Sequence, residues 1–345
     1  MGSNMPPSQD MAAWYDGRKH VYGGYASEIK SLVEKLISSH DIPVHSITCR
    51  LKERDSFLKK CERKHYTDPV REMTDLSGVR IIAYTTSDVD KICALIEEEF
   101  SIDKKNSMDK AKILATDRVG YLSKHYVAKS RSNRSKLKEY NQFKNLPCEI
   151  QIRTMLQHAW AEIEHDRSYK FSGVLPQEID RRFHLIAGVL EVVDTEFQRL
   201  SDEIDDYAES VKAETSKRNL TIPIDSISLM EYLKTKLSQY PQIEATFFGN
   251  DDTLIKELGD FEIHLLSDLE QIITDEMITG SAQKSVQNYT GFLRDMMIIS
   301  DAAKYFAKAW KSQWKSISIE DVDYLVAHGV KRTMLEKYVD TVDKY

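Results

Sequence analysis

Two carboxylates, each at the end of an apolar run, are the residues of this sequence best placed to do chemistry. Asp75 precedes the β-branched run from Val79 to Tyr84, and Glu149 lies in an alternating stretch that begins at Cys148. A carboxylate pair can hold Mg²⁺ between phosphate oxygens, and one member can accept a proton from an attacking hydroxyl. The pair therefore indicates phosphoryl or pyrophosphoryl transfer.

A basic run upstream supplies groups that suit a polyphosphate. From Arg50 to Lys64, seven lysines or arginines stand against three acidic residues. Four polar residues of the run are spaced so that several could converge where a strand turns into a helix: Arg50, Lys52, Ser56 and Lys60. A helix N-terminus offers free N–H groups to phosphate, and lysines offer charge. The alternative for this run alone is a solvated basic helix.

A glycine-led strand further along could hold a base. Gly120 is followed by three alternating polar residues, Tyr121, Ser123 and His125. The glycine would let the backbone bend close to a ligand, and the tyrosine ring would then lie against a base. Taken alone the signal is weak, because the histidine could equally be a satisfied residue of a sheet.

The elements that must position these residues follow from hydrophobic spacing. Alternation over 148–154 predicts a strand with Glu149, Gln151 and Arg153 on one face and isoleucines on the other. An apolar stripe predicts a helix that begins near Thr154. A second helix, over 87–100, is expected to pack on the sheet and close a β–α unit.

The overall composition is that of an ordinary soluble protein, with 41% hydrophobic and 30% charged residues among 345. No run approaches the roughly twenty apolar residues of a membrane span, and the N-terminus does not resemble a signal peptide. We therefore expect a cytoplasmic protein that does not bind membranes. A net charge of −7 argues against non-specific coating of nucleic acid. The cysteines lack the spacing of a zinc site or a disulfide framework: Cys49, Cys61, Cys93 and Cys148.

Four motifs, taken in order, resemble the synthetase domain of the RelA/SpoT family of (p)ppGpp synthetases. They are R-x-K-x-x-x-S-x-x-x-K from Arg50 to Lys60, D-L-x-G-x-R from Asp75 to Arg80, G-Y-x-S-x-H from Gly120 to His125, and E-I-Q-I-R-T from Glu149 to Thr154. The resemblance implies an α+β fold, with a mixed β-sheet flanked by helices in a nucleotidyltransferase-like synthetase domain. It also implies transfer of pyrophosphate from ATP to the 3′-hydroxyl of GDP or GTP, which makes the alarmone of the stringent response.

The resemblance assigns the donor side of the site residue by residue. Arg50 and Arg80 would stack on the adenine of ATP, a use that suits planar guanidinium groups. Lys52, Ser56 and Lys60 would hold the ATP phosphates. No Walker-type loop or kinase signature competes with this assignment.

The resemblance also implies a metal cofactor and an acceptor pocket. Asp75 and Glu149 would bind Mg²⁺, and Glu149 would be the base for the 3′-hydroxyl. The acceptor nucleotide would be bound by Gly120, Tyr121, Ser123, His125 and Arg153, with the ring of Tyr121 on its base, His125 near its phosphates and Arg153 in a supporting part.

Two departures leave the acceptor open. Val119 replaces the asparagine that usually precedes the glycine, and residues 158–166 resemble a branch that includes toxin-type members. Those members pyrophosphorylate the 3′ end of tRNA or make adenosine analogues, so tRNA or an adenosine nucleotide is the first alternative. A non-catalytic nucleotide sensor is the second, although a pure binder need not keep a carboxylate pair. No hydrolase half is recognised.

Spacing further along predicts the domain organisation. We expect a synthetase domain with a trailing long helix over 20–208, a polar linker over 209–220 and an all-helical accessory or regulatory domain over 221–345. The long helix carries a heptad-like seam: Phe183, Ile186, Leu190, Val193, Phe197, Leu200 and Ile204. We expect the seam to dock on the chain's own sheet or C-terminal helices. The alternative is a homo-oligomer interface through 183–204.

Overall fold

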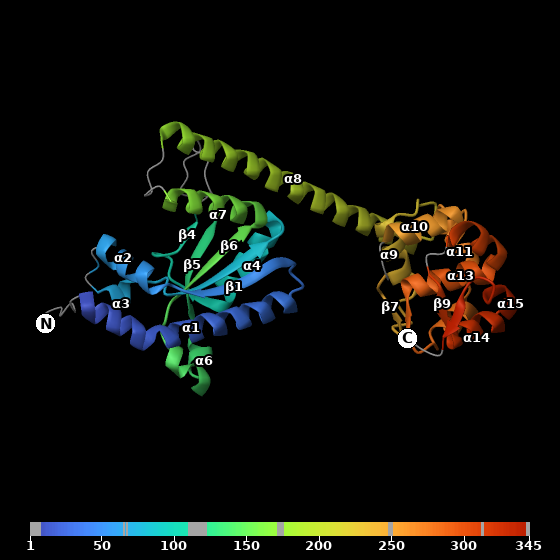
Figure 1. The fold of residues 1–345 in the computed structure, drawn as a ribbon, viewed down its shortest axis with the longest axis horizontal. Helices are drawn as coiled ribbons and strands as arrows, with labels where there is room; N and C mark the ends of the chain where they lie inside the picture. Colours follow the sequence, from blue (N-terminus) through green and yellow to red (C-terminus); the bar gives the residue numbers. More distant parts are fainter. Residues whose placement is uncertain are drawn as a thin grey trace. The chain divides into compact units, whose positions relative to one another are not determined.

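A computed structural model of the chain describes residues 8–64, 66, 68–109, 123–170, 176–247, 251–311 and 314–342. The chain divides into an N-terminal unit, Met1–Ser201, and a C-terminal unit, Asp202–Tyr345, each with its own hydrophobic core (Figure 1). Within the described ranges, no helix has both the length and the apolar character needed to cross a membrane.

A mixed β-sheet is the centre of the N-terminal unit. Its strands are β1 (Val44–Leu51), β2 (Ser77–Ala83), β3 (Phe100–Ile102), β4 (Met108–Asp109), β5 (Lys124–Ser130) and β6 (Cys148–Thr154). The order is β1-β2-β6-β5-β3, with β4 also paired to β5. Strands β2 and β6 are parallel, whereas the other neighbours are antiparallel. The predicted α+β fold with a mixed sheet is thus confirmed.

The alternating residues of β2 and β6 give this sheet one apolar and one polar face. Val79, Ile81 and Ile150 are buried in a single cluster with side chains of two helices, α1 (Ser8–Ser39) and α4 (Thr86–Glu99). Because successive side chains of a strand point to opposite faces, the residues between these positions lie on the other face. That second face carries the candidate site.

Shorter elements complete the N-terminal unit. They are α2 (Arg54–Lys64), α3 (Pro69–Glu72), α6 (Ser132–Ser135), the 3₁₀ helix η1 (Lys138–Phe143) and α7 (Met155–Lys170). Helix α2 is anchored by Phe57, which is fully buried among Tyr15, Leu76 and other apolar residues. The hydroxyl of Tyr15 also donates a 2.5 Å hydrogen bond to the carbonyl of Lys52. These contacts fix the junction of β1 and α2, where the basic run lies.

Helix α8 (Gln177–Ser216) is longer than expected, because residues 209–216, predicted as part of the linker, continue it. The polar residues that suggested a linker pair along the helix instead, as Lys212 does with Glu209 at 3.6 Å.

The seam on α8 also differs from expectation. Three seam residues of the N-terminal unit are about half exposed, so the expectation that they dock on its sheet is wrong: Ile186 at 50%, Phe197 at 51% and Leu200 at 53%. Helix α8 instead contacts the end of β6 through Asp194 and the first turn of α4 through Gln198.

The C-terminal unit is helical, as predicted, with two short parallel ladders that the sequence pattern did not indicate. Its helices are α9 (Ser226–Lys236), α10 (Asp251–Asp260), α11 (Leu266–Ile272), α12 (Asp275–Ser281), α13 (Tyr289–Lys304), the π-helix η2 (Tyr305–Ala309), α14 (Ile319–Ala327) and α15 (Arg332–Leu335). The ladders pair β7 (Ile243–Glu244) with β8 (Gln287–Asn288) and β9 (Ser316–Ser318) with β10 (Asp340–Val342). Fully buried Phe292, Leu293 and Met296 place α13 at the centre of the core.

Candidate active site

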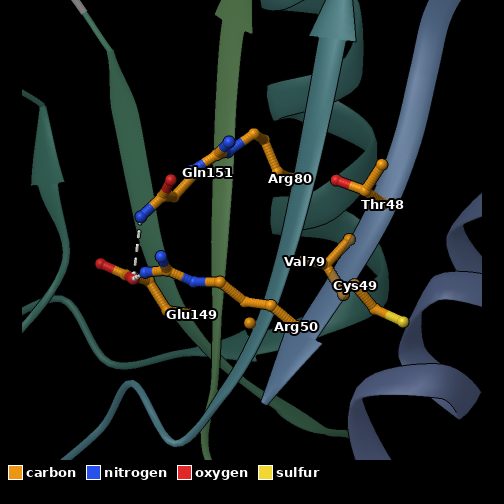
Figure 2. Close-up of a pocket in the computed structure, with 8 residues that line it drawn as sticks. Thr48, Cys49, Arg50, Val79, Arg80, Glu149 and Gln151 are labelled. Atoms are coloured by element: carbon orange, nitrogen blue, oxygen red, sulfur yellow. Dashed lines mark hydrogen bonds and ion pairs between the residues drawn. The ribbon is translucent and has the colours of Figure 1, made fainter. Parts of the chain in front are cut away.

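The sheet register brings three strands together at the site. Gly78 of β2 lies opposite Arg50 of β1 on one side and Glu149 of β6 on the other. A Cβ atom on Gly78 would come within 3.2 Å of the Arg50 side chain, so the glycine lets that side chain lie flat across β2. Figure 2 shows the Arg50 guanidinium beside the Glu149 carboxylate, and the Nη2–Oε2 distance is 3.9 Å. Together with Arg80 and Gln151, these residues line a pocket of about 250 Å³.

Asp75 receives two lysines at the entry to β2. Lys52 Nζ and Lys60 Nζ both donate to Asp75 Oδ2, at 2.9 and 2.7 Å. Burial opposes the charge of Asp75, but the two hydrogen bonds and charges of the lysines more than offset it, and the pKa of Asp75 is lowered. The carboxylate is therefore ionised at neutral pH, and two positive charges meet one negative charge.

Glu149 is held by neighbours on both sides. His125 Nδ1 lies 3.1 Å from Oε1, and the amide of Gln151 donates to Oε2 at 2.9 Å. Burial and the nearby charge of Asp75 raise the pKa of Glu149, but the interactions with His125 and Gln151 outweigh them and the pKa is lowered. The result is an ionised carboxylate whose two oxygens are oriented by separate partners.

A third carboxylate, Glu162 of α7, holds two arginines of the sheet. Its Oε1 accepts from Arg80 Nη1 at 2.8 Å and from Arg153 Nη2 at 3.2 Å. Arg153 is buried, and the contact it shares with Arg80 is to Glu162 rather than to Glu149. The structure therefore groups Arg153 with the donor-side Arg80.

Sequence reasoning gave no role to Glu162 or Gln151. Alternation placed Gln151 on the same face of the strand as Glu149, but Gln151 was not among the predicted site residues. Glu162 could have been found only from the helix that follows β6 directly, because a side chain two turns into such a helix can reach back over the strand ends.

Not every predicted residue joins the cluster. Ser56 is exposed on the first turn of α2. Ser123 is buried just before β5, and its hydroxyl has no hydrogen-bond partner in the described part of the chain. Gly120 and Tyr121 lie outside the described residues, as does the start of the strand predicted from Val119.

Comparison with protein families bears directly on this cluster. Residues 49–174 match a family model described as the region found in RelA / SpoT proteins. All the predicted site residues, from Arg50 to Arg153, lie within this span. The resemblance carried by the four motifs is thus confirmed. The match covers the segment that contains all four motifs and less than half of the chain.

Individual relatives match about half of the chain. The chain is 27% identical over 166 residues to the GTP pyrophosphokinase YjbM of Bacillus subtilis (strain 168), covering 47% of this chain and 74% of that protein. It is 27% identical over 174 residues to the GTP pyrophosphokinase YwaC of the same strain, covering 49% and 79%. Among solved structures, the small alarmone synthetase 1 of Bacillus subtilis matches with a TM-score of 0.46 and 24% identity, over 56% of this chain and 98% of that one.

Proposed function

We propose that this protein is an ATP-dependent nucleotide 3′-pyrophosphokinase that uses GDP or GTP as acceptor and makes (p)ppGpp. The observation that carries the proposal is the meeting of Lys52 and Lys60 on Asp75, within electrostatic reach of Glu149. A cluster of this composition suits a triphosphate whose transfer needs a carboxylate base. The two relatives named GTP pyrophosphokinase support the same reaction for this chain.

Positive charge exceeds negative charge along the donor side of the site. The four cations are Arg50, Lys52, Lys60 and Arg80, and the three carboxylates that contact them are Asp75, Glu149 and Glu162. The lysines would bind the phosphates of ATP, and the two guanidinium groups at the pocket would stack on its adenine. Ser56 would add a hydroxyl contact from the first turn of α2.

The proposed reaction is a single displacement. The 3′-oxygen of the acceptor attacks the β-phosphorus of ATP, the bond from that phosphorus to the α,β-bridging oxygen breaks, and AMP leaves. Glu149 takes the proton of the attacking hydroxyl, which its lowered pKa allows because the carboxylate is ionised at neutral pH. A positioned base of this kind contributes about 10²- to 10⁴-fold to a rate.

The carboxylates fit Mg²⁺ as the cofactor. Asp75 Oδ1 is buried and has no hydrogen-bond partner among the residues described, so one oxygen of the pair is open to a cation. No third His, Cys, Asp or Glu forms a metal cluster with them in the described ranges, which suits Mg²⁺ because this ion is usually held by one or two carboxylates together with substrate phosphates. Asp75 and Glu149 would hold the ion. When bound, it would neutralise charge on the phosphate oxygens.

A guanosine acceptor is favoured over the tRNA end and the adenosine nucleotide by the names of the relatives. On the acceptor side, His125 stands next to Glu149, where it can contact acceptor phosphates. Gly120, Tyr121 and Ser123 would complete the pocket, whereas Arg153, which shares Glu162 with Arg80, would support the donor side. We place the protein in the cytoplasm, where its nucleotide substrates are found.

The half-exposed seam of α8 supports a homo-oligomer. A heptad repeat packs best against another helix with the same repeat, and a second copy of this chain provides one. Phe197→Glu would put a charge in the middle of the seam. Light scattering after size-exclusion chromatography should show a loss of mass on this substitution, and a monomeric parent protein would contradict the interface.

The direct test of the function is an acceptor panel. The full chain is incubated with Mg²⁺ and ATP labelled in its γ-phosphate, with GDP, GTP, ATP or bulk tRNA in separate reactions. Label should appear in guanosine products, and the Asp75→Asn variant should give none. Label found only on tRNA or on an adenosine product would overturn the guanosine assignment. Label absent from every acceptor, with nucleotide still bound, would favour the sensor.

A further inference from the structure

The C-terminal unit contains a cavity to which nothing above gives a role. It has a volume of about 700 Å³ and lies between β8, α13, β9 and α14. Ligand pockets for small molecules usually have about 300–1,000 Å³. Its apolar wall includes Val286, Ile298, Ile317 and the ring of Trp314. The cavity is therefore large enough, and apolar enough, to take the body of an organic molecule.

Carboxylates dominate the polar wall of this cavity. Asp295 and Asp321 share one lysine, because Lys284 Nζ donates to Asp295 Oδ2 at 2.5 Å and to Asp321 Oδ1 at 2.7 Å. The same Nζ lies 4.4 Å from the centre of the Tyr324 ring, so Lys284 is fully engaged. Glu320 adds a third carboxylate to the wall.

One carboxylate oxygen of the buried residue Asp295 is left for a ligand. Asp295 Oδ2 accepts from Lys284 and from the amide of Gln287 at 2.9 Å. Asp295 Oδ1 accepts no hydrogen bond from the part of the chain that is described, although the residue is only 6% exposed and lines the cavity. An anionic oxygen in such a place is stabilised by a cation or a strong donor.

The arrangement around Asp295 is built into the backbone. A Cβ atom on Gly291 would come within 2.4 Å of Gln287 Oε1, so only glycine leaves room for this amide to reach Asp295 and Ser281. The cation on the wall, Arg294, is neutralised from behind by fully buried Glu257, which accepts two of its N–H groups at 2.9 and 2.6 Å. The net charge that a ligand meets is therefore negative.

We propose that this cavity is a binding site for an organic cation, an ammonium or guanidinium group on an apolar body, with the charged group at Asp295 Oδ1 and the body against Ile317 and Trp314. The Arg294 guanidinium already lies 6.0 Å from the centre of the Trp314 ring, so Trp314 contributes apolar contact to the body of the ligand. The negative wall disfavours nucleotides and other phosphates. The cation could be a free amine or a basic side chain of a peptide, since both present the same group.

The first experiment observes Trp314 in the full chain. The protein is labelled with 5-fluorotryptophan, and Trp314→Phe assigns its fluorine resonance among those of the four tryptophans. Phenethylamine should shift the Trp314 resonance at millimolar concentration, whereas 3-phenylpropionate, which has a carboxylate in place of the amine, should not. Trp14 and Trp160 belong to the N-terminal unit and should stay unchanged.

Charges of opposite sign, introduced at exposed Val286 of the cavity wall, test the electrostatics of the site without disturbing the fold. Val286 is 74% exposed, so Val286→Lys and Val286→Glu should both fold normally. Lysine should weaken phenethylamine binding about fivefold and glutamate should strengthen it by about the same factor. The matched control is Asp323→Asn, which removes a carboxylate of the same helix α14 that pairs with Arg332 and does not line the cavity. It should leave binding unchanged.

A second titration, with a lysine-containing peptide, distinguishes a free amine from a basic side chain as the source of the cation. Tighter binding of acetyl-Leu-Lys-Leu-amide than of phenethylamine would assign the site to a protein segment, and weaker binding would assign it to a free amine. The proposal is overturned if phenethylamine leaves Trp314 unshifted, if 3-phenylpropionate or GDP shifts it as strongly, or if the two Val286 variants change affinity in the same direction.

Discussion

The two units each hold a cluster of lysine and aspartate side chains, and the composition of the cluster is reversed between them. In the N-terminal unit Lys52 and Lys60 meet Asp75, whereas in the C-terminal unit Asp295 and Asp321 meet Lys284. The first cluster has an excess of positive charge, and the second has an excess of negative charge. The same two residue types therefore form clusters of opposite net charge, which suit the ligands of opposite sign that we propose for them.

Burial differs between the clusters as well. The side chains of Lys52 and Lys60 are 15% and 21% exposed, but that of Lys284 is only 3% exposed. A partly exposed pair exchanges its partner for substrate phosphate at little cost to the fold. A buried group that loses its partner leaves an uncompensated charge, which destabilises the unit. We therefore expect substitutions in the first cluster to change activity and those in the second to change stability.

The largest effect is expected from Glu149→Gln. An amide cannot take the proton of the attacking hydroxyl, so the transfer rate should fall about a thousandfold. ATP binding, measured by calorimetry, should change little because the lysines remain. A variant that keeps a substantial share of the parent rate would show that Glu149 is not the base.

The second largest effect is expected from Lys284→Met, and it should be a loss of stability rather than of transfer rate. Two buried carboxylates would lose their common partner, which should lower the free energy of unfolding by about 3–5 kcal/mol. Denaturant unfolding of the full chain measures this loss. Lys308→Met is the control, because Lys308 is 53% exposed in its pair with Glu262 and should cost less than about 1 kcal/mol. Equal losses of stability in the Lys284 and Lys308 variants would contradict the claim that burial determines the cost of losing a lysine.

Lys60→Met should show the opposite pattern. Transfer should fall about a hundredfold, because a cation that stabilises the moving phosphates is removed. The free energy of unfolding should change by no more than about 1 kcal/mol, since Lys52 still neutralises Asp75. Lys59→Met alters the exposed neighbour on the same helix and should leave both quantities unchanged. A stability loss equal to that of Lys284→Met would remove the distinction between the clusters.

The smallest effect is expected from Glu162→Gln. Glu162 holds the guanidinium groups of Arg80 and Arg153, but its side chain is 54% exposed, so the loss of its charge should weaken ATP binding only about fivefold. KM for ATP should rise while kcat stays near the parent value. Glu34→Gln, which alters a partly exposed pair with Lys30 far from the site residues in the sequence, serves as the comparison. A fall in kcat with KM unchanged would place Glu162 in the chemical step instead.

Much of the N-terminal cluster could be predicted because its determinants are local. Strand alternation placed Glu149 on a polar face, and the short motif from Asp75 to Arg80 placed a carboxylate at a strand entry. The contact of Glu162 with Arg80 could not be predicted in the same way. It joins residues 82 positions apart and depends on how α7 packs over β2.

The C-terminal cluster shows why the rest was not predicted. Asp321 is 37 residues from Lys284, and no sequence motif indicates that their side chains meet. The cavity exists only because two short ladders and two helices meet around it, and strands of two or three residues leave no periodic signal. The seam on α8 was visible in the sequence, but periodicity alone cannot show whether a stripe is covered within one chain.

The most direct test of the central claim is the identity of the nucleotide that ATP leaves behind. The purified chain, with Mg²⁺, ATP and GDP, is followed by phosphorus NMR together with mass spectrometry of the products. Transfer of pyrophosphate as a unit predicts AMP and a guanosine product that carries two added phosphates, formed in equal amounts and absent with Glu149→Gln. ADP in place of AMP would mean phosphoryl transfer and would contradict the account.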